Sequence, residues 1–178
     1  MRGYEVRVIL NEFSPITSRD IVVPDYYTFE DLKNVINIIW GFTDNEKSLF
    51  ILRPFNDVVA DESLKNDYNV KYDIHTTQIK EIFNKSLEIT YLYDLNERWL
   101  IGVKVNGKVK CDNDHAIVTD FEGKYNPIEK CGGVWELSEI IYFSKNPKKR
   151  DNSKNAKLVD KLKKFDIDEV NEKLKNFK

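Results

Sequence analysis

The sequence predicts an α+β fold built on a largely antiparallel sheet. Two observations carry this prediction. Apolar residues switch along the 178-residue chain between the two-residue period of strands and the 3.6-residue period of helices, and the elements follow the order strands, helix, strands, helices. Hydrophobic residues make up 41% of the chain, which is enough to build a core. The length fits one domain, 1–178.

The N-terminal part predicts a β-hairpin followed by a helix. Residues 4–10 alternate apolar and polar side chains, as half-buried strands do, and residues 19–23 predict a second strand that Pro24 stops. The hydroxyl of Thr28 is placed to cap a helix over 29–40, and Gly41 is the natural residue to end it. The apolar face of this helix consists of Phe29, Leu32, Val35, Ile36 and Ile39.

The middle of the chain predicts further strands. Residues 48–52 and 57–60 fit short strands, and 76–83 fits a short helix with a threonine cap. The segment 86–111 predicts a three-stranded antiparallel meander, because Asn106-Gly107 is the strongest two-residue hairpin signal in the chain. Residues expected in the core include Val6, Val8, Leu32, Ile36, Ile39, Ile89, Tyr91 and Trp99.

The C-terminal third predicts a loop followed by helices. Residues 112–131 are rich in Asp, Asn, Gly and Pro and predict a long surface loop, and apolar spacing predicts a helix over 135–144. Helices are also predicted over 156–165 and 167–176, the second opened by a D-x-x-E capping box. The organisation is therefore an α+β body (1–144), a charged linker (145–155) and a C-terminal helical pair (156–178).

The charge is distributed unevenly. Residues 145–178 hold 12 Lys and Arg against 6 Asp and Glu, whereas 1–144 holds 16 against 24. A basic C-terminal part of this kind indicates contact with nucleic acid. The favoured interpretation is instead a helix whose lysines are solvated and keep it soluble. We expect weak, sequence-independent nucleic-acid binding at most. The candidate contacts are Lys148, Lys149, Arg150, Lys154, Lys157, Lys161, Lys163 and Lys164.

Several common mechanisms lack their signatures. No phosphate-binding loop, dinucleotide-binding glycine motif or nucleophile elbow occurs, and no cofactor is expected. His75, His115, Cys111 and Cys131 show no close-spaced ligand pair, so no metal site is expected. No apolar run approaches the roughly 20 residues that span a bilayer, and the N-terminus does not fit a signal peptide, so a cytoplasmic protein without membrane contact is expected.

The stretch EKCGGVWE (129–136) is the part of the sequence most suggestive of chemistry. Two glycines permit positive φ and a close backbone approach, and helix N–H groups after them favour an anion or a thiolate at Cys131. Reactivity would require a cationic or basic partner, and none is identifiable. The favoured interpretation is a structural loop-to-helix corner that the bulk of Trp135 pins, with Cys131 inert.

A resemblance to one family is carried by SPITSRDIVVPDYYTFEDLKNVINIIWGFTD (14–44), YLYDLNERW (91–99), NPIEKCGGVWE (126–136) and FDIDEVNEKL (165–174). Together, in this order, they resemble the plasmid-Ri ORF-three-like proteins, some of which are called transposon-passenger proteins. The resemblance spans nearly the whole chain. It implies an α+β fold and a link to mobile elements, with no established biochemical activity.

The sequence also departs from the family pattern. Ser18 stands where the family usually has a tryptophan, Asn126 where it has the first cysteine of C-P-P-E-D-C-G-G, and Glu46 and Ser48 where it has H-x-H. If relatives bind a metal through these His and Cys residues, this chain lacks most of the ligands.

Three classes of function fit these observations. The favoured one is a non-enzymatic binding or adaptor module for an unknown protein or small-molecule ligand. The alternatives are a weak nucleic-acid-associated protein of a mobile element and a small hydrolase or transferase using Asp94, Glu129 and Cys131. The candidate functional surface comprises Asp94, Trp99, Glu129, Cys131, Gly132, Gly133 and Trp135.

Overall fold

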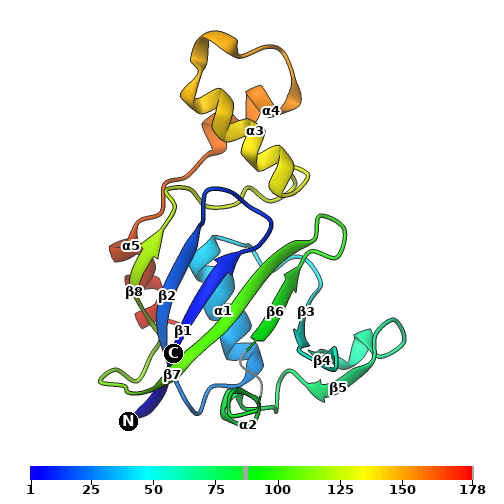
Figure 1. Cartoon of the computed structure of the whole chain (residues 1–178), viewed down its shortest axis with the longest axis vertical. Coiled ribbons are helices and arrows are strands. Elements are labelled where there is room, and N and C mark those ends of the chain that lie inside the picture. The colour runs from blue at the N-terminus through cyan, green and yellow to red at the C-terminus, as the bar shows by residue number, and fades with distance from the viewer. Residues whose placement is uncertain (86–87, 178) are drawn as a thin grey trace.

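A computed structural model describes residues 1–85 and 88–177 of the chain. Within this part, the strands form one eight-stranded sheet in the order β5-β4-β3-β6-β7-β1-β2-β8 (Figure 1). The strands are β1 (Arg2–Leu10), β2 (Ser18–Pro24), β3 (Ser48–Leu52), β4 (Asp57–Ala60), β5 (Val70–Asp73), β6 (Glu88–Tyr93), β7 (Trp99–Lys110) and β8 (Ile117–Glu122). Every pairing is antiparallel except that of β4 with β5. The predicted α+β class is confirmed.

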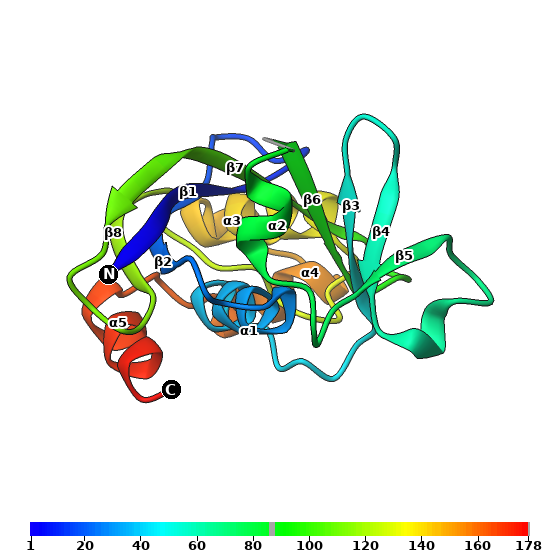
Figure 2. The same ribbon diagram turned by 90° about the horizontal axis from the view of Figure 1, so that it is seen from below.

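The N-terminal hairpin and helix are as predicted. β1 and β2 pair antiparallel, and α1 (Phe29–Trp40) follows. The Thr28 side chain accepts from the Asp31 backbone N–H while the Asp31 carboxylate accepts from the Thr28 N–H, a complete capping box. Gly41 ends α1 in the left-handed region at φ 74°. Figure 2 shows the sheet curving over α1.

The predicted hairpin at Asn106-Gly107 is wrong. β7 runs without interruption from Trp99 to Lys110, and Gly107 does not adopt the positive φ that such a turn requires. β1 lies along the whole length of β7 as its neighbour, with a register shift where Glu5 opposes Gly107 and Val6 opposes Val105. Asn106 is therefore the extra residue of a β-bulge, because pairing with β1 outweighs the local turn preference.

Two strands were not predicted. β8 lies inside the segment 112–131, which was predicted to be a loop, and it pairs with β2 at the edge of the sheet. Ala116 and Val118 are buried there, since the apolar run 116–118 outweighs the surrounding turn residues. β5 adds a parallel edge strand at the opposite end. Part of the predicted strand 86–94, residues 86 and 87, lies outside the described residues.

The helices after α1 differ from prediction in length. α2 (Ile79–Phe83) is shorter than the predicted 76–83, and its N-cap is Gln78 and not a threonine, with the Gln78 backbone N–H donating to the Glu81 carboxylate. α3 (Val134–Lys145) is close to the predicted 135–144. The predicted helix 156–165 is wrong, because only α4 (Lys154–Lys157) and a 3₁₀ turn (Leu158–Lys161) form there. The chain then extends alongside Lys124 and Asn126.

The C-terminal elements pack in two places. α3, α4 and the 3₁₀ turns Pro147–Lys149 and Leu158–Lys161 contact one another and project beyond one end of the sheet. We call residues 131–161 the arm. α5 (Ile167–Lys175) instead contacts α1 and β8, and Asp166 caps it by accepting from the N–H groups of Asp168 and Glu169.

The main core lies between the sheet and α1 and extends into the arm. All eight residues predicted for the core are buried. Leu137, Ile140 and Phe143 of α3 belong to the same cluster, so the arm is continuous with the body. A smaller cluster around Leu49, Val58 and Leu92 lies beneath the β3–β5 end. No helix within the described residues is long and apolar enough to cross a membrane.

Candidate functional site

The candidates predicted for the functional surface, except Trp135, lie where two segments touch, residues 94–99 and 129–133, which we call the corner. Glu97 holds the two loops together. Its carboxylate accepts from the Trp99 indole Nε1 (3.0 Å), from the Lys130 backbone N–H (3.0 Å) and from the Gly132 N–H (2.8 Å). Trp99 is fully buried, so Glu97 supplies the partner that its indole N–H requires.

Glu129 makes a second set of bonds on the other side of the corner. Its carboxylate accepts from the Tyr93 hydroxyl and from both the backbone N–H and the hydroxyl of Thr43 (3.1 Å each). Burial, followed by the hydrogen bond to Glu129, raises the pKa of Tyr93 well above its usual range. Phe42 stacks on the Tyr93 ring at 4.2 Å. Glu129 is therefore held by Tyr93 of β6 and by Thr43 in the loop that follows α1.

Asp94 and Lys130 complete the corner. The buried Asp94 carboxylate accepts from the N–H groups of Asn96 (2.9 Å) and Glu97 (3.2 Å), which closes the turn between β6 and β7. Lys130 forms ion pairs with Glu46 and, at 3.6 Å, with Asp94. The hydrogen bond to Glu46 raises the pKa of Lys130. The carboxylates of the corner thus each have a donor within it.

The glycine pair is required by the backbone path. Gly132 and Gly133 have φ of 119° and 104°, a region that side-chain-bearing residues rarely adopt. A Cβ at Gly133 would also lie 3.2 Å from the Glu97 carbonyl oxygen. Cys131 beside them is fully buried, and burial raises the pKa of its thiol. A thiol with a raised pKa is a poor nucleophile.

Trp135 does not pin the corner as predicted. It lies on the outer face of α3 and is 80% exposed. Tyr142, two helical turns further along, is 44% exposed, so α3 presents two aromatic rings to solvent. The bulk that closes the corner comes instead from Trp99 and Phe42, whose rings are 6.1 Å apart.

A cavity of about 610 Å³ adjoins the corner between α1, the segment 126–129 and the start of α5. We call it the α1–α5 cavity. Its lining residues are Ile38, Trp40, Gly41, Thr43, Asn126, Pro127, Ile128, Glu129, Asp160, Lys161, Lys163, Lys164, Asp166, Glu169, Val170 and Lys173. Cys131 lines a different cavity, of about 350 Å³, with Glu136 and Lys154. Glu129 and Cys131 therefore face separate spaces.

Arg19 lies fully buried behind the wall of the α1–α5 cavity. Its guanidinium carbon is 3.8 Å from the centre of the Phe165 ring and 4.7 Å from that of Trp40. The guanidinium donates to the carbonyl oxygens of Ser18, Glu122 and Gly123 and, at 3.1 Å, to Asn126 Oδ1. Within the described residues Arg19 forms no ion pair, and burial lowers its pKa to about 10.

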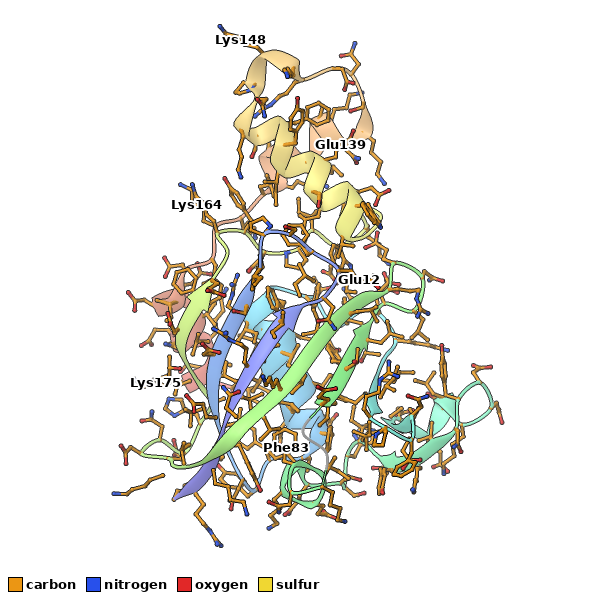
Figure 3. All side chains as sticks on the ribbon, in the orientation of Figure 1. Glu12, Phe83, Glu139, Lys148, Lys164 and Lys175 are labelled. Carbon is orange, nitrogen blue, oxygen red and sulfur yellow. The ribbon has the colours of Figure 1, made fainter. Side chains whose placement is uncertain are left out.

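The basic candidates are spread over three places. Lys148, Lys149 and Arg150 lie at the arm tip, Lys154 and Lys157 in α4, and Lys161, Lys163 and Lys164 at the cavity. Figure 3 shows Lys148 at the far end of the arm and Lys164 near its base. Two of them support the arm itself, because Lys154 Nζ donates to the Cys131 carbonyl and Arg150 Nε to that of Phe143.

The described residues contain no group of three or more His, Cys, Asp or Glu side chains placed to hold a metal ion. His75 lies between Glu30 and Asp61, with 2.9 Å from one ring nitrogen to each carboxylate. His115 pairs with the neighbouring Asp114, and Cys111 and Cys131 are both buried and free. The four residues weighed as ligands do not form such a group.

The family model described as "Plasmid pRiA4b ORF-3-like protein" matches residues 2–174. The chain belongs to this family. A search of curated proteins found no match. Among solved structures, the chain is similar to the crystal structure of a protein of unknown function from Methanosarcina mazei Go1, with a TM-score of 0.77 and 22% identity over 95% of this chain and 97% of that one. At this identity the likeness establishes the fold alone.

Sequence reasoning missed several residues of this pRiA4b ORF-3-like chain that shape the site. Thr43, Glu46 and Tyr93 bind the corner carboxylates or Lys130, but ordinary polar residues in loops give no distinguishing signal. Arg19 stands between Ser18 and Asp20 at the polar start of β2, so its burial gives no distinguishing signal either. Its bond to Asn126 joins residues 107 positions apart, which spacing cannot reveal.

Proposed function

We propose that this pRiA4b ORF-3-like protein is a non-enzymatic, cytoplasmic binding module whose ligand site is the α1–α5 cavity. The observation that carries the proposal is the contrast between the two neighbouring sites. The corner uses its unusual residues to hold loops together, whereas the cavity beside it offers about 610 Å³ and is lined by Trp40, whose indole Nε1–H has no hydrogen-bond partner among the described residues. Ligand sites in proteins are concave spaces of this size with a few polar groups.

The corner supports a structural role. Glu97 accepts three donors, Glu129 accepts three, and Asp94 closes a turn. A general acid or base must reach a substrate, and these carboxylates are already engaged inside the protein. The corner instead positions Glu129 and Thr43, which both line the cavity.

The hydrolase or transferase alternative finds less support. It needs Asp94, Glu129 and Cys131 around one substrate, but Glu129 and Cys131 line separate cavities. Native protein should react slowly with a thiol reagent at Cys131, and unfolded protein should react at the ordinary rate. A thiolate that titrates below the usual value of about 8.5 would favour the enzyme.

Ligand-observed NMR with a set of anionic, cationic and neutral fragments tests the proposal. The cavity is blocked with Ile38→Trp, because Ile38 is a half-buried lining residue, and Ile38→Leu is the volume-conserving control. Fragments bound by the native protein and by Ile38→Leu should be released by Ile38→Trp. No bound fragment, or binding that Ile38→Trp leaves unchanged, would contradict the proposal.

Weak nucleic-acid association is the second candidate, and a link to mobile elements is proposed with it. The observation in its favour is that the arm carries exposed Trp135 and Tyr142 close to basic residues, with Lys149 Nζ 5.7 Å from the Tyr142 ring centre. Exposed rings beside cations suit stacking on single-stranded bases. The surface would then be the arm and not the cavity.

Titration of a labelled single strand at low and physiological salt distinguishes the two candidates. Binding through the arm should be weak, with a Kd near the 10⁻⁴–10⁻⁶ M typical of non-specific contacts. For each tenfold rise in salt concentration, the logarithm of the association constant should fall by about 0.7 per phosphate neutralised. Trp135→Ala should weaken it, with Trp135→Phe as the control that keeps a stacking ring. Equal binding by Trp135→Ala would remove the arm from consideration.

A further inference from the structure

The wall of the α1–α5 cavity contains a buried positive charge that the described part of the chain does not neutralise. Arg19 is 0% exposed and is held by three carbonyl oxygens, one amide oxygen and the faces of aromatic rings. Buried charges in proteins are ordinarily paired. An uncompensated guanidinium behind a cavity wall favours a negative charge in the cavity.

Asn126 lies between Arg19 and the cavity, and its hydrogen bond with Arg19 fixes the orientation of its amide group. Arg19 Nη2 donates to Asn126 Oδ1 at 3.1 Å, so the amide is fixed with its oxygen toward Arg19. The Nδ2 atom then lies on the other side, beside Gly41, where a Cβ would be 3.5 Å from it. Both Asn126 and Gly41 line the cavity. The amide N–H₂ is therefore a pre-oriented donor at the cavity wall.

Trp40 provides a second donor. It lines the cavity and is 0% exposed, and its indole Nε1–H has no hydrogen-bond partner among the described residues. Leaving a buried donor unsatisfied is costly, so such donors are few in native proteins and each one calls for an explanation. Arg19 Nε is likewise buried and without a partner there.

Four lysines and four carboxylates line the cavity, so their formal charges balance, and the buried Arg19 adds one positive charge behind the wall. Lys161, Lys163 and Lys164 line it and form no ion pair within the described residues, whereas Lys173 pairs with Glu169 at 2.5 Å. Of the acidic lining residues, Asp166 accepts from α5 backbone N–H groups and Glu129 is held by Tyr93 and Thr43. Asp160 is the remaining carboxylate, and it is exposed.

We infer that the α1–α5 cavity binds a small molecule bearing an oxyanion, a carboxylate or a phosphate, held by the Asn126 amide and the Trp40 indole with Lys163 and Lys164 at its entrance. Arg19 is the positioning residue, since it orients Asn126 and supplies the buried positive charge. This inference rests on the proposed function and adds the class of ligand. The oxyanion supplies the acceptors that these donors lack.

Thermal unfolding of the full chain with inorganic phosphate, succinate and the matched neutral succinamide tests the inference. A ligand of the folded state raises Tm with its concentration, so phosphate or succinate should give a saturable rise over about 0.1–10 mM, and succinamide should give none. Chloride at the same ionic strength controls for screening. A response to phosphate alone or to succinate alone identifies which oxyanion is preferred.

Three substitutions localise the effect. Asn126→Asp places a carboxylate where the anion would bind and should abolish the Tm response. Trp40→Phe keeps the ring over Arg19 but removes one donor, and should weaken binding by about three- to tenfold. Lys163→Gln/Lys164→Gln should weaken binding, whereas the control Lys148→Gln/Lys149→Gln, with the same charge change at the arm tip, should not.

The outcomes separate this inference from the proposed function. Binding of neutral fragments that Ile38→Trp abolishes, without any response to phosphate or succinate, would overturn the anion and leave the binding module standing. If the native protein binds neither the fragments nor the anions, both the proposed function and this inference are overturned. A phosphate response that Asn126→Asp and Lys163→Gln/Lys164→Gln leave unchanged would place the anion elsewhere and overturn the inference.

Discussion

The corner and the α1–α5 cavity share Glu129 and lie side by side, yet their polar groups differ in whether they have hydrogen-bond partners. In the corner, the carboxylates of Glu97 and Glu129 each accept from three donors. Behind the cavity, a buried guanidinium has no carboxylate partner within the described residues, and Arg19 Nε and Trp40 Nε1 have no acceptor.

The difference shows that unusual sequence and open chemistry need not coincide. The Cys-Gly-Gly stretch attracts attention because its residues are rare together, and the structure uses them for a tight backbone path with φ above 100° at both glycines. The unsatisfied groups belong to Arg19 and Trp40, which lie on different elements, a strand and a helix. A satisfied network rigidifies the protein, and an unsatisfied one is where a partner is expected.

The largest expected effect tests whether the two regions unfold as one unit. Ile36 is fully buried on α1, the helix that supports both regions. Ile36→Ala should lower the free energy of unfolding by about 2–5 kcal/mol through lost contacts and a cavity. Urea unfolding followed by tryptophan fluorescence and by circular dichroism should give coincident transitions. Separate transitions would contradict this expectation, because the corner and the cavity would then unfold independently of each other.

Glu97→Gln tests the satisfied network. The amide keeps one acceptor oxygen but removes the charge and places an N–H₂ group against N–H donors. Because hydrogen bonds to charged groups contribute about 1.5–3 kcal/mol, we expect a loss of about 1–3 kcal/mol in urea unfolding. Asn96→Gln on the exposed turn nearby is the control, and it should change little. A stability equal to that of the native protein would mean that Glu97 does not hold the corner.

Asn126→Asp replaces an amide with a carboxylate at the α1–α5 cavity, the reverse of Glu97→Gln in the corner. Its effect on the free energy of unfolding should have the opposite sign. The new carboxylate pairs with Arg19 and should raise the free energy of unfolding by about 1 kcal/mol at neutral pH. A carboxylate beside a guanidinium has a depressed folded-state pKa. The gain should therefore be present above pH of about 4 and be lost as the pH falls further. Destabilisation at neutral pH would show that Arg19 already has the charge balance it needs.

The smallest expected effect comes from a surface site that belongs to neither region. Hydrogen bonds that His75 donates to the carboxylates of Asp61 and then Glu30 raise the pKa of this half-exposed side chain to about 9, above its usual 6.5. Its stabilisation is therefore complete below pH 6.5 and lost as the pH rises through 9, and solvent screening keeps it below about 1 kcal/mol. His75→Gln should flatten the dependence of Tm on pH over this range. An unchanged profile would show that the pairs contribute nothing in solution.

The sequence by itself determined the local elements whose signals lie within a few residues. Thr28, Asp31 and Gly41 specify both ends of α1, alternation specifies β1, and the apolar run that ends at Pro24 specifies β2. The family resemblance is confirmed by the match over residues 2–174.

Only the tertiary structure decided the features that depend on distant partners. Asn106-Gly107 has the local chemistry of a hairpin, but the available edge of β1 turns it into a bulge. Trp135 is bulky enough to fill the corner, yet α3 faces it outward because Leu137, Ile140 and Phe143 occupy the buried side. Arg19 and Asn126 meet across 107 residues of chain, and the long-range packing of α1, β2 and α5 creates the cavity beside them. Such juxtapositions arise from burial and pairing of whole elements, which local sequence periods do not encode.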